Sequence, residues 1–161
     1  MDLKAFSEKF YRELTFAHIQ PVLDTLIWLK QETDIWLELT TLLIPGKNDT
    51  DEEIKSMCDW ILNNLGDSVP LHFSAFHPAF RMKDIPATPV QTVLHARELA
   101  LSAGLKYCYV GNVHQPEAQS TFCHNCQKTL IERNWHQIHF LKIQNGKCLN
   151  CGQEIEGHWG N

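Results

Sequence analysis

Several features that would point to a membrane or a nucleic acid are missing from this sequence of 161 residues. Its 14 lysines and arginines are outnumbered by 19 aspartates and glutamates, the net charge is −5, and no basic block is present. Binding to nucleic acid or to an anionic membrane usually needs such a block, so neither partner is expected. No run approaches the roughly eighteen apolar residues of a membrane span, and the first residues lack a signal-peptide pattern. We therefore expect a cytoplasmic location.

Common catalytic motifs are missing as well. The sequence contains no nucleophile elbow, no P-loop and no glycine-rich dinucleotide fingerprint. Its apolar fraction of 43% and charged fraction of 20% nevertheless predict a soluble globular protein with a core. The length suits one ordinary domain with a small appendage. Function has to be sought in the cysteines and in polar residues on predicted strands.

Cysteine is plentiful, and four of the six cysteines form two CxxC pairs. The pairs are Cys123-His124-Asn125-Cys126 and Cys148-Leu149-Asn150-Cys151. Two such pairs that face each other place four thiolates around one tetrahedral metal ion. Because the four sulfurs close the shell and leave no position for a substrate, the pattern predicts a structural metal.

The metal is expected to be zinc, in a zinc-ribbon-like module, with a rubredoxin-like iron site as the second option. Two disulfides or four unrelated buried thiols would also account for the four cysteines. A reducing cytosol favours the metal interpretation over disulfides. The remaining cysteines, Cys58 and Cys108, stand singly in apolar periodic segments and are expected in the core.

The first three quarters of the chain alternate between strand and helix patterns. Strands are predicted over 34–44, 70–76 and 106–110, and helices over 6–14, 20–30, 51–65 and 89–103. Thr88 is the predicted N-cap of the last helix, with Pro89 at its first position and Leu101 on its inner face. Strand and helix in alternation predict an α/β fold with a parallel sheet. We place this domain at residues 1–116 and the cysteine module at 117–161, with the boundary between 115 and 120.

Polar residues on these strands are the candidate ligand contacts, because ligands bind at the carboxyl ends of parallel strands. Asp2 and Lys4 are two residues apart and share a face if the chain is extended there, although a frayed, solvated terminus has the same pattern. Glu38 and Thr40 share a face of the first strand, which indicates a polar lumen or an edge strand exposed to water. His77 ends the second strand, where it could bind an anion or move a proton, or be an ordinary loop histidine.

The same residues occur in an ordered set of motifs that covers nearly the whole chain. The set resembles the C-terminal half of the AmmeMemoRadiSam-system radical SAM enzymes, which are similar to pyruvate formate-lyase activating enzymes. In chain order the motifs are residues 2–6 (DLKAF), 23–26 (LDTL), 40–49 (TTLLIPGKND), 70–78 (PLHFSAFHP), 109–114 (YVGNVH) and the CxxC pairs. The resemblance implies a partial (β/α) barrel in which a [4Fe-4S] cluster cleaves S-adenosylmethionine to a 5′-deoxyadenosyl radical.

The resemblance also implies roles for individual residues. Asp2 and Lys4 match the D-x-K element near the methionine end of S-adenosylmethionine, and Lys4 would pair with its carboxylate. His77 matches a histidine close to that cofactor, and Glu38 and Thr40 lie on a strand whose lumen face approaches it. The family name implies Memo-like and AMMECR-like proteins as partners.

One departure from the family is decisive. The family's cluster is held by a CxxxCxxC motif, which this sequence lacks, and the closed CxxC shell does not replace it. We therefore expect a fragment of a radical SAM enzyme (a truncated gene, a split gene or a late-start gene model) that is inactive alone and has no catalytic residue of its own. Its exposed strand edge would bind the missing half or a second copy of the chain. The alternative function is a non-catalytic zinc-ribbon interaction module on an α/β support.

Overall fold

The protein is described here by a computed structural model, in which residues 1–135 and 137–159 are placed. It divides into two compact units, Met1–Val113 and His114–Asn161. This division precedes residues 115–120, where the sequence places the boundary. Each unit is described by itself.

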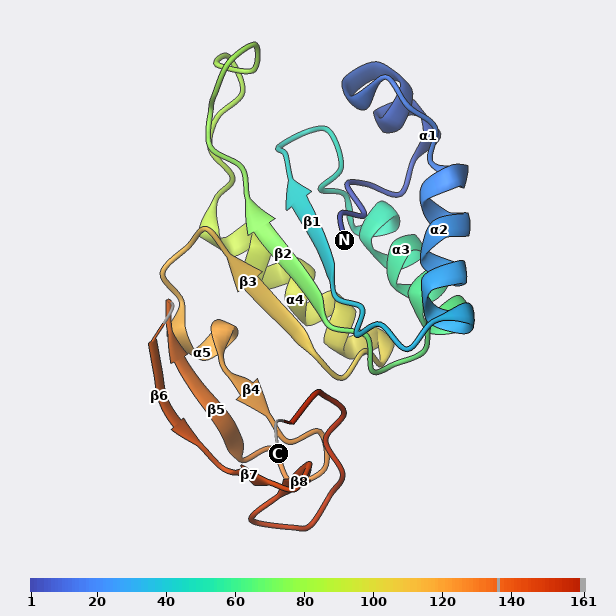
Figure 1. The fold of residues 1–161 in the computed structure, drawn as a ribbon. Coiled ribbons are helices and arrows are strands. Elements are labelled where there is room, and N and C mark those ends of the chain that lie inside the picture. Colours follow the sequence, from blue (N-terminus) through green and yellow to red (C-terminus); the bar gives the residue numbers. More distant parts are fainter. Residues whose placement is uncertain (136, 160–161) are drawn as a thin grey trace. The chain divides into compact units, whose positions relative to one another are not determined.

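The first unit is built on a parallel sheet of three strands in the order β1-β2-β3 (Figure 1). The strands are β1 (Leu39–Leu43), β2 (Leu71–Ala75) and β3 (Cys108–Gly111), joined by helices α3 (Asp51–Asn64) and α4 (Val90–Ala103). The predicted α/β fold with a parallel sheet is therefore confirmed. In Figure 1, α4 crosses behind the sheet and α3 lies beside it.

The two faces of this sheet differ in burial. One face is fully buried and holds Leu39, Thr41, Leu43, Leu71, Phe73, Ala75, Cys108 and Val110. The other face is half-buried and, in register across the three strands, presents Thr40, His72 and Tyr109, then Leu42, Ser74 and Gly111. Because strand side chains alternate between faces, each strand supplies apolar packing on one side and polar groups on the other. This half-buried face carries the candidate ligand contacts.

The two connecting helices begin differently. Thr50 caps α3 by accepting from the Glu53 backbone N–H at 3.3 Å. The prediction that Thr88 caps α4 is wrong. The N-cap is Pro89, and Thr88 is buried, with its hydroxyl donating to the Leu43 carbonyl at 2.6 Å and accepting from the Phe76 N–H at 3.0 Å. The Leu43 carbonyl and the Phe76 N–H lie at the end of the β1–β2 ladder, which stops at the pair Leu43 and Ala75. The Thr88 hydroxyl satisfies both groups and is therefore not used as a helix cap.

Two further expectations are corrected. The first strand begins at Leu39 rather than at residue 34, and Ile35 is 62% exposed before it. Ladder pairing to the second strand starts only where the Leu39 N–H donates to the Pro70 carbonyl, so an alternating pattern alone placed the start too early. Leu101, predicted on the inner face of α4, is 37% exposed, whereas Ala96 is buried there.

The N-terminal helices are α1 (Glu8–Phe10), a π-helical turn η1 (Tyr11–Thr15) and α2 (Gln20–Glu32). The sequence predicts one regular helix over the first two. A π turn widens the helix by one residue, and here it lets Phe10 and Tyr11, adjacent in sequence, both be buried. They form a small core with Ala5, Ile44 and Phe76 beside the carboxyl ends of β1 and β2.

The second unit is made of short antiparallel strands. One sheet has the order β4-β5-β6, with β4 (Thr121–Phe122), β5 (Thr129–Asn134) and β6 (Gln137–Leu141), preceded by α5 (Pro116–Gln119). A separate hairpin pairs β7 (Ile143–Gln144) with β8 (Lys147–Cys148). Its two turn residues, Asn145 and Gly146, both have positive φ, as a tight hairpin of this kind requires.

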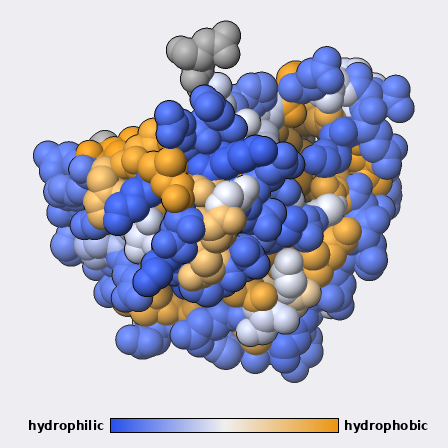
Figure 2. Space-filling view, turned by 90° about the horizontal axis from the view of Figure 1, so that it is seen from below, coloured by the Kyte–Doolittle hydropathy of each residue, from blue (hydrophilic) through white to orange (hydrophobic). Residues whose placement is uncertain are grey.

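The exposed surface in one view is mostly hydrophilic, with the hydrophobic residues in separate patches (Figure 2). Among the described residues, no helix combines the length and the apolar character needed to cross a bilayer.

Candidate functional site

Residues Met1 to Leu3 extend the parallel sheet beyond β1. Asp2 forms a parallel bridge with Thr40, the Leu3 N–H donates to the Thr40 carbonyl at 3.0 Å, and Leu3 is fully buried. With Leu3 on the buried face, Asp2 and Lys4 lie on the half-buried one. Their side chains pair there, with Lys4 Nζ 2.8 Å from Asp2 Oδ2. This segment is therefore an ordered part of the sheet rather than a frayed end.

Asp2 joins the two polar residues around it. The Thr40 hydroxyl donates to Asp2 Oδ1 at 2.6 Å, and the Lys4 ammonium donates to the other carboxylate oxygen. Hydrogen bonding from Lys4, followed by that from Thr40, lowers the pKa of the Asp2 carboxyl below its ordinary value of 3.8. Asp2 is thus held ionised, and the Lys4 ammonium is oriented at an exposed position where an anionic ligand could reach it.

Three buried side chains hold the backbone of this segment. The Thr41 hydroxyl donates to the Leu3 carbonyl at 2.8 Å, and the Tyr11 hydroxyl accepts from the Lys4 N–H at 3.1 Å. Asn48, 2% exposed, donates to the carbonyls of Lys4 and Leu42 and accepts from the Ile44 N–H. Asn48 therefore ties the end of β1 to the Asp2–Lys4 segment, which explains physically why an amide stands in the turn after that strand.

A histidine–carboxylate pair lies on the same half-buried face. His72 Nε2 is 2.9 Å from Glu38 Oε2, and the His72 ring lies against Tyr109 with a centroid distance of 5.0 Å. The other Glu38 oxygen accepts from the Trp36 indole N–H at 2.9 Å. Glu38 and Thr40 therefore both reach this face, as the sequence predicts, and His72 joins them.

His77 lies beyond the carboxyl end of β2. Its ring nitrogen Nε2 is 3.4 Å from the carbonyl oxygen of Asn112, which follows β3, and the side chain is exposed. Asn112 has a φ of 60° and donates to the Ala75 carbonyl at 3.1 Å, so it links the ends of the two strands. His77 and Lys4 thus both stand at the carboxyl edge of the sheet.

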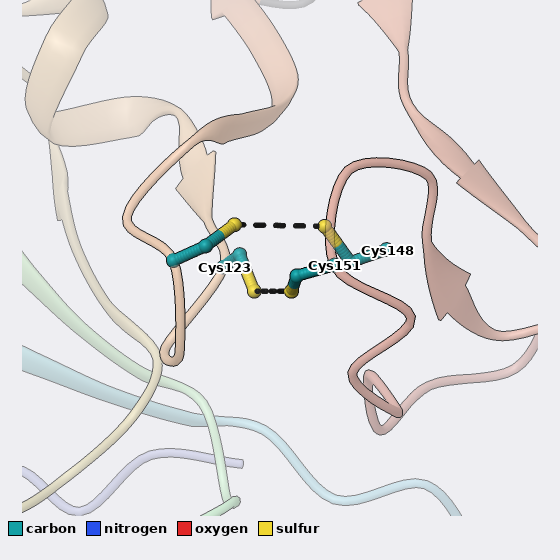
Figure 3. A group of neighbouring side chains, drawn as sticks. Cys123, Cys148 and Cys151 are labelled. Carbon is teal, nitrogen blue, oxygen red and sulfur yellow. Dashed lines mark hydrogen bonds between the residues drawn. The ribbon is translucent and has the colours of Figure 1, made fainter.

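The four cysteines of the second unit converge. Their sulfur atoms all lie within 4.8 Å of one another, and within the part of the chain that the structure describes they form the one such group of potential ligands. Cys123 and Cys151 sulfurs are 3.6 Å apart, and Cys126 and Cys148 sulfurs are 3.8 Å apart (Figure 3). A tetrahedral ion with metal–sulfur distances of about 2.3 Å has sulfur–sulfur edges of about 3.8 Å. The arrangement therefore fits a single metal ion.

The two CxxC tips have the same backbone hydrogen bonds. The N–H of the residue after each second cysteine donates to the carbonyl of the first cysteine at 2.9 Å, from Gln127 to Cys123 and from Gly152 to Cys148. Both of these residues have positive φ, 59° and 75°. Each first cysteine is buried, whereas Cys126 is half-buried and Cys151 is exposed. The two tips are therefore related by an approximate two-fold symmetry. We call the more exposed sulfurs, which belong to the second cysteines Cys126 and Cys151, the outer sulfurs.

The electrostatics of the two sulfurs in the first tip differ. Burial raises the pKa of the Cys123 thiol to about 11, and a hydrogen bond from the Lys128 backbone lowers the pKa of Cys126 to about 6. A bound cation would stabilise all four thiolates and release their protons. The donor set suits Zn²⁺ or iron equally, because both accept four thiolates in a tetrahedron.

The remaining cysteines are not placed to bind an iron–sulfur cluster. Cys58 and Cys108 are buried in the first unit, and burial raises the pKa of each thiol to about 12. A [4Fe-4S] cluster needs three or four deprotonated cysteines around it. The described residues do not fit that group.

The fold of the chain is similar to that of a domain of pyruvate-formate lyase-activating enzyme from Bacteroides vulgatus, with a TM-score of 0.58. The superposition covers 69% of this chain and 65% of that domain at 16% sequence identity, which shows likeness of fold alone. In sequence, the chain is 38% identical over 158 residues to the uncharacterized protein MJ0808 of Methanocaldococcus jannaschii. That match takes in 97% of this chain and 47% of MJ0808, so the chain spans about half the length of this relative. No family profile matches the chain.

Sequence reasoning did not single out Asn48, His72 and Tyr109 as a group. The alternation on the second strand does place His72 on the face of Thr40, but its contact with Glu38 depends on parallel register between strands far apart in the chain. Asn125 and Asn150, which contact cysteine sulfurs, were also missed. Their signal was present in the repeated C-x-N-C pattern of the two pairs.

Proposed function

We propose that this chain supplies the S-adenosylmethionine-facing part of a partial (β/α) radical SAM barrel. Support comes from the activating-enzyme-like fold, and the single observation that carries the proposal is the placement of Lys4 and His77 at the carboxyl edge of the parallel sheet. In this proposal Lys4 binds the methionine carboxylate, Asp2 orients Lys4, and His77 lies near the same group. Glu38 and Thr40 line the lumen face beside them.

The sequence lacks the CxxxCxxC motif, and the cysteines that the structure places do not fit the cluster that this chemistry requires. When bound in a complete enzyme, the cluster would supply the electron that cleaves S-adenosylmethionine. We therefore propose that this chain is inactive alone and that a segment with the CxxxCxxC motif completes it. In the absence of that segment, the open edge of the sheet beyond Met1 to Leu3 would bind a second copy of the chain. Memo-like and AMMECR-like proteins are the further partners in this proposal.

The cysteine module in this proposal is a zinc ribbon that binds zinc structurally. Each sulfur is used by the tetrahedron, so the ion has no open position for a reaction. The ion would stabilise the short strands of the second unit.

A second candidate is a non-catalytic interaction module. It is favoured by three exposed apolar side chains on or next to the β5–β6 hairpin, Trp135, Ile138 and Leu141, which are 50%, 58% and 54% exposed. Exposed apolar groups of this size are typical of protein contact surfaces. In this case the sheet of the first unit would have no ligand.

Binding of S-adenosylmethionine to the full chain separates the two candidates. Ligand-observed saturation-transfer NMR should show contact between the methionine moiety and the wild-type chain. We expect Lys4→Met to weaken binding about tenfold, because a charge-assisted hydrogen bond is lost, and His77→Ala to weaken it less. Lys55→Met is the matched control, since Lys55 is an exposed lysine that pairs only weakly with Asp51, at 3.9 Å.

Equal signals from the wild type, Lys4→Met and His77→Ala would rule out the proposed ligand site. No signal from the wild type would favour the interaction module.

A further inference from the structure

Two asparagines contact the cysteine cluster in a reciprocal way. The side-chain amide of Asn125 donates to Cys151 Sγ at 3.7 Å, and that of Asn150 donates to Cys126 Sγ at 3.4 Å. Each asparagine thus reaches from its own CxxC tip to the second cysteine of the opposite tip. The same contact made twice, by the same residue type at the same position of each motif, is the observation on which the inference rests.

The backbones of these asparagines serve the other two sulfurs. The Asn150 N–H donates to Cys148 Sγ at 3.4 Å, and the Asn125 N–H donates to Cys123 in the equivalent position. All four sulfurs therefore receive an N–H from one of two residues. The asparagine backbones serve the buried first cysteines, and the asparagine side chains serve the outer ones, of which Cys126 also accepts from the Lys128 backbone.

The outer sulfurs are the ones that need such a donor. Four thiolates around a divalent cation leave two negative charges in excess, and only Cys126 and Cys151 are open to water, acid and electrophiles. A hydrogen bond to a thiolate lowers its tendency to take a proton and fixes its direction toward the metal. Both asparagines are exposed, so burial does not offset the conformational entropy that their side chains lose when they are fixed. The hydrogen bonds to the sulfurs have to offset that loss.

We propose that Asn125 and Asn150 are positioning residues of the metal centre. Each amide clamps the outer cysteine of the opposite tip, which holds the two tips together and slows loss of the metal. This inference rests on the proposed metal site, and it concerns neither S-adenosylmethionine nor the sheet of the first unit.

The test uses the full chain loaded with zinc, and chelator competition measures its zinc affinity. Asn125→Ala and Asn150→Ala should each weaken zinc binding about tenfold, and the double variant about a hundredfold, as is typical for groups that orient metal ligands. The isosteric variants Asn125→Asp and Asn150→Asp keep the shape of the turn and replace the donor with a negative charge. They should weaken binding more than alanine does.

Alkylation with iodoacetamide, mapped by mass spectrometry, supplies a readout that a general loss of stability would not produce. Asn125→Ala should speed modification of Cys151, and Asn150→Ala should speed modification of Cys126. The controls are Leu149→Ala and Gln127→Ala, at exposed neighbours in the two tips; the Gln127 side chain donates to the His124 carbonyl at 3.2 Å. They should stay within about twofold of the wild type.

Each outcome has one meaning. Wild-type affinity and alkylation rates in the asparagine variants would overturn the clamp and leave the metal site intact. Faster alkylation within the mutated tip, instead of across to the other, would also overturn it, because it would show a local turn effect. A wild-type chain that takes up no zinc would remove the metal site and this inference together, without bearing on S-adenosylmethionine binding.

Discussion

Thr88 shows how one hydroxyl can join separate parts of a fold. It lies at 5% exposure between the ends of β1 and β2, where it donates to the Leu43 carbonyl and accepts from the Phe76 N–H. Its own N–H donates to the Phe76 carbonyl at 3.0 Å. The long segment that follows β2, which extends past the sheet in Figure 1, therefore returns to the sheet at this residue.

Replacing Thr88 with valine should lower the free energy of unfolding by about 2–4 kcal/mol, because two buried backbone groups lose their partners. Thr88→Ser keeps the hydroxyl and should cost about 1 kcal/mol or less. Urea denaturation followed by circular dichroism gives the free energies, and hydrogen exchange of the Phe76 amide reports the local contact. Similar losses for valine and serine would show that the methyl group, rather than the hydroxyl, matters.

At the scale of elements, β2 and β3 approach each other closely at Gly111. A Cβ atom at this position would lie 2.8 Å from Ser74 Oγ and 3.7 Å from Ser74 Cβ. A side chain at this position would therefore press on Ser74 of the neighbouring strand, and the backbone of Gly111 itself does not call for glycine, since its φ is not in the left-handed region. Ser74 and Gly111 are register partners on the half-buried face.

Gly111→Ala should destabilise the first unit by about 1–2 kcal/mol, since the Ser74 hydroxyl must move away. The double variant Ser74→Ala/Gly111→Ala removes the clashing oxygen and should recover most of that loss, with Ser74→Ala as the single control. The coupling between the two changes, measured by a double-mutant cycle of unfolding free energies, is expected to be about 1 kcal/mol. Additive effects would mean that Ser74 rotates away at no cost.

At the scale of the whole molecule, the two units are stabilised by different means. The first has many buried apolar residues, among them Leu26, Ile54, Ile61 and Phe73. The second has short strands and a small set of buried apolar residues, among them Leu130, Ile131, Ile143 and Ile155. A unit of fewer than about 50 residues usually needs a metal or disulfides to remain folded.

Removing the metal should therefore unfold the second unit and leave the first folded. After chelation we expect hydrogen exchange to speed up in peptides from residues 114–161 and to stay unchanged in peptides from residues 1–113. Lower pH should act in the same direction, because protonation of the thiolates competes with the metal. Equal loss of protection in both units would show instead that they unfold cooperatively.

Much of the fold could be predicted from local patterns. The CxxC pairs and the alternation of strand and helix patterns are short-range signals whose physical causes act within a few residues, and the structure contains both of them. The same reasoning failed where a distant group competed for a residue. Thr88 has the sequence of a cap but accepts and donates at two strand ends, and residues 34–38 have a strand pattern but precede the ladder, which begins at Leu39.

For this protein, then, sequence alone determined the order of strands and helices in the first unit, its parallel sheet, and the four sulfurs that converge on one centre. Those features depend on periodicity, turn chemistry and ligand spacing, which are local. Only the tertiary structure decided that Asp2 and Lys4 pair beside Thr40, that Glu38 meets His72, and that Asn125 and Asn150 reach across to the opposite cysteine pair. These contacts join residues that are 20 or more positions apart, or they depend on strand register. Parallel register is set by packing of the buried face of the sheet, and no short segment of the sequence determines it.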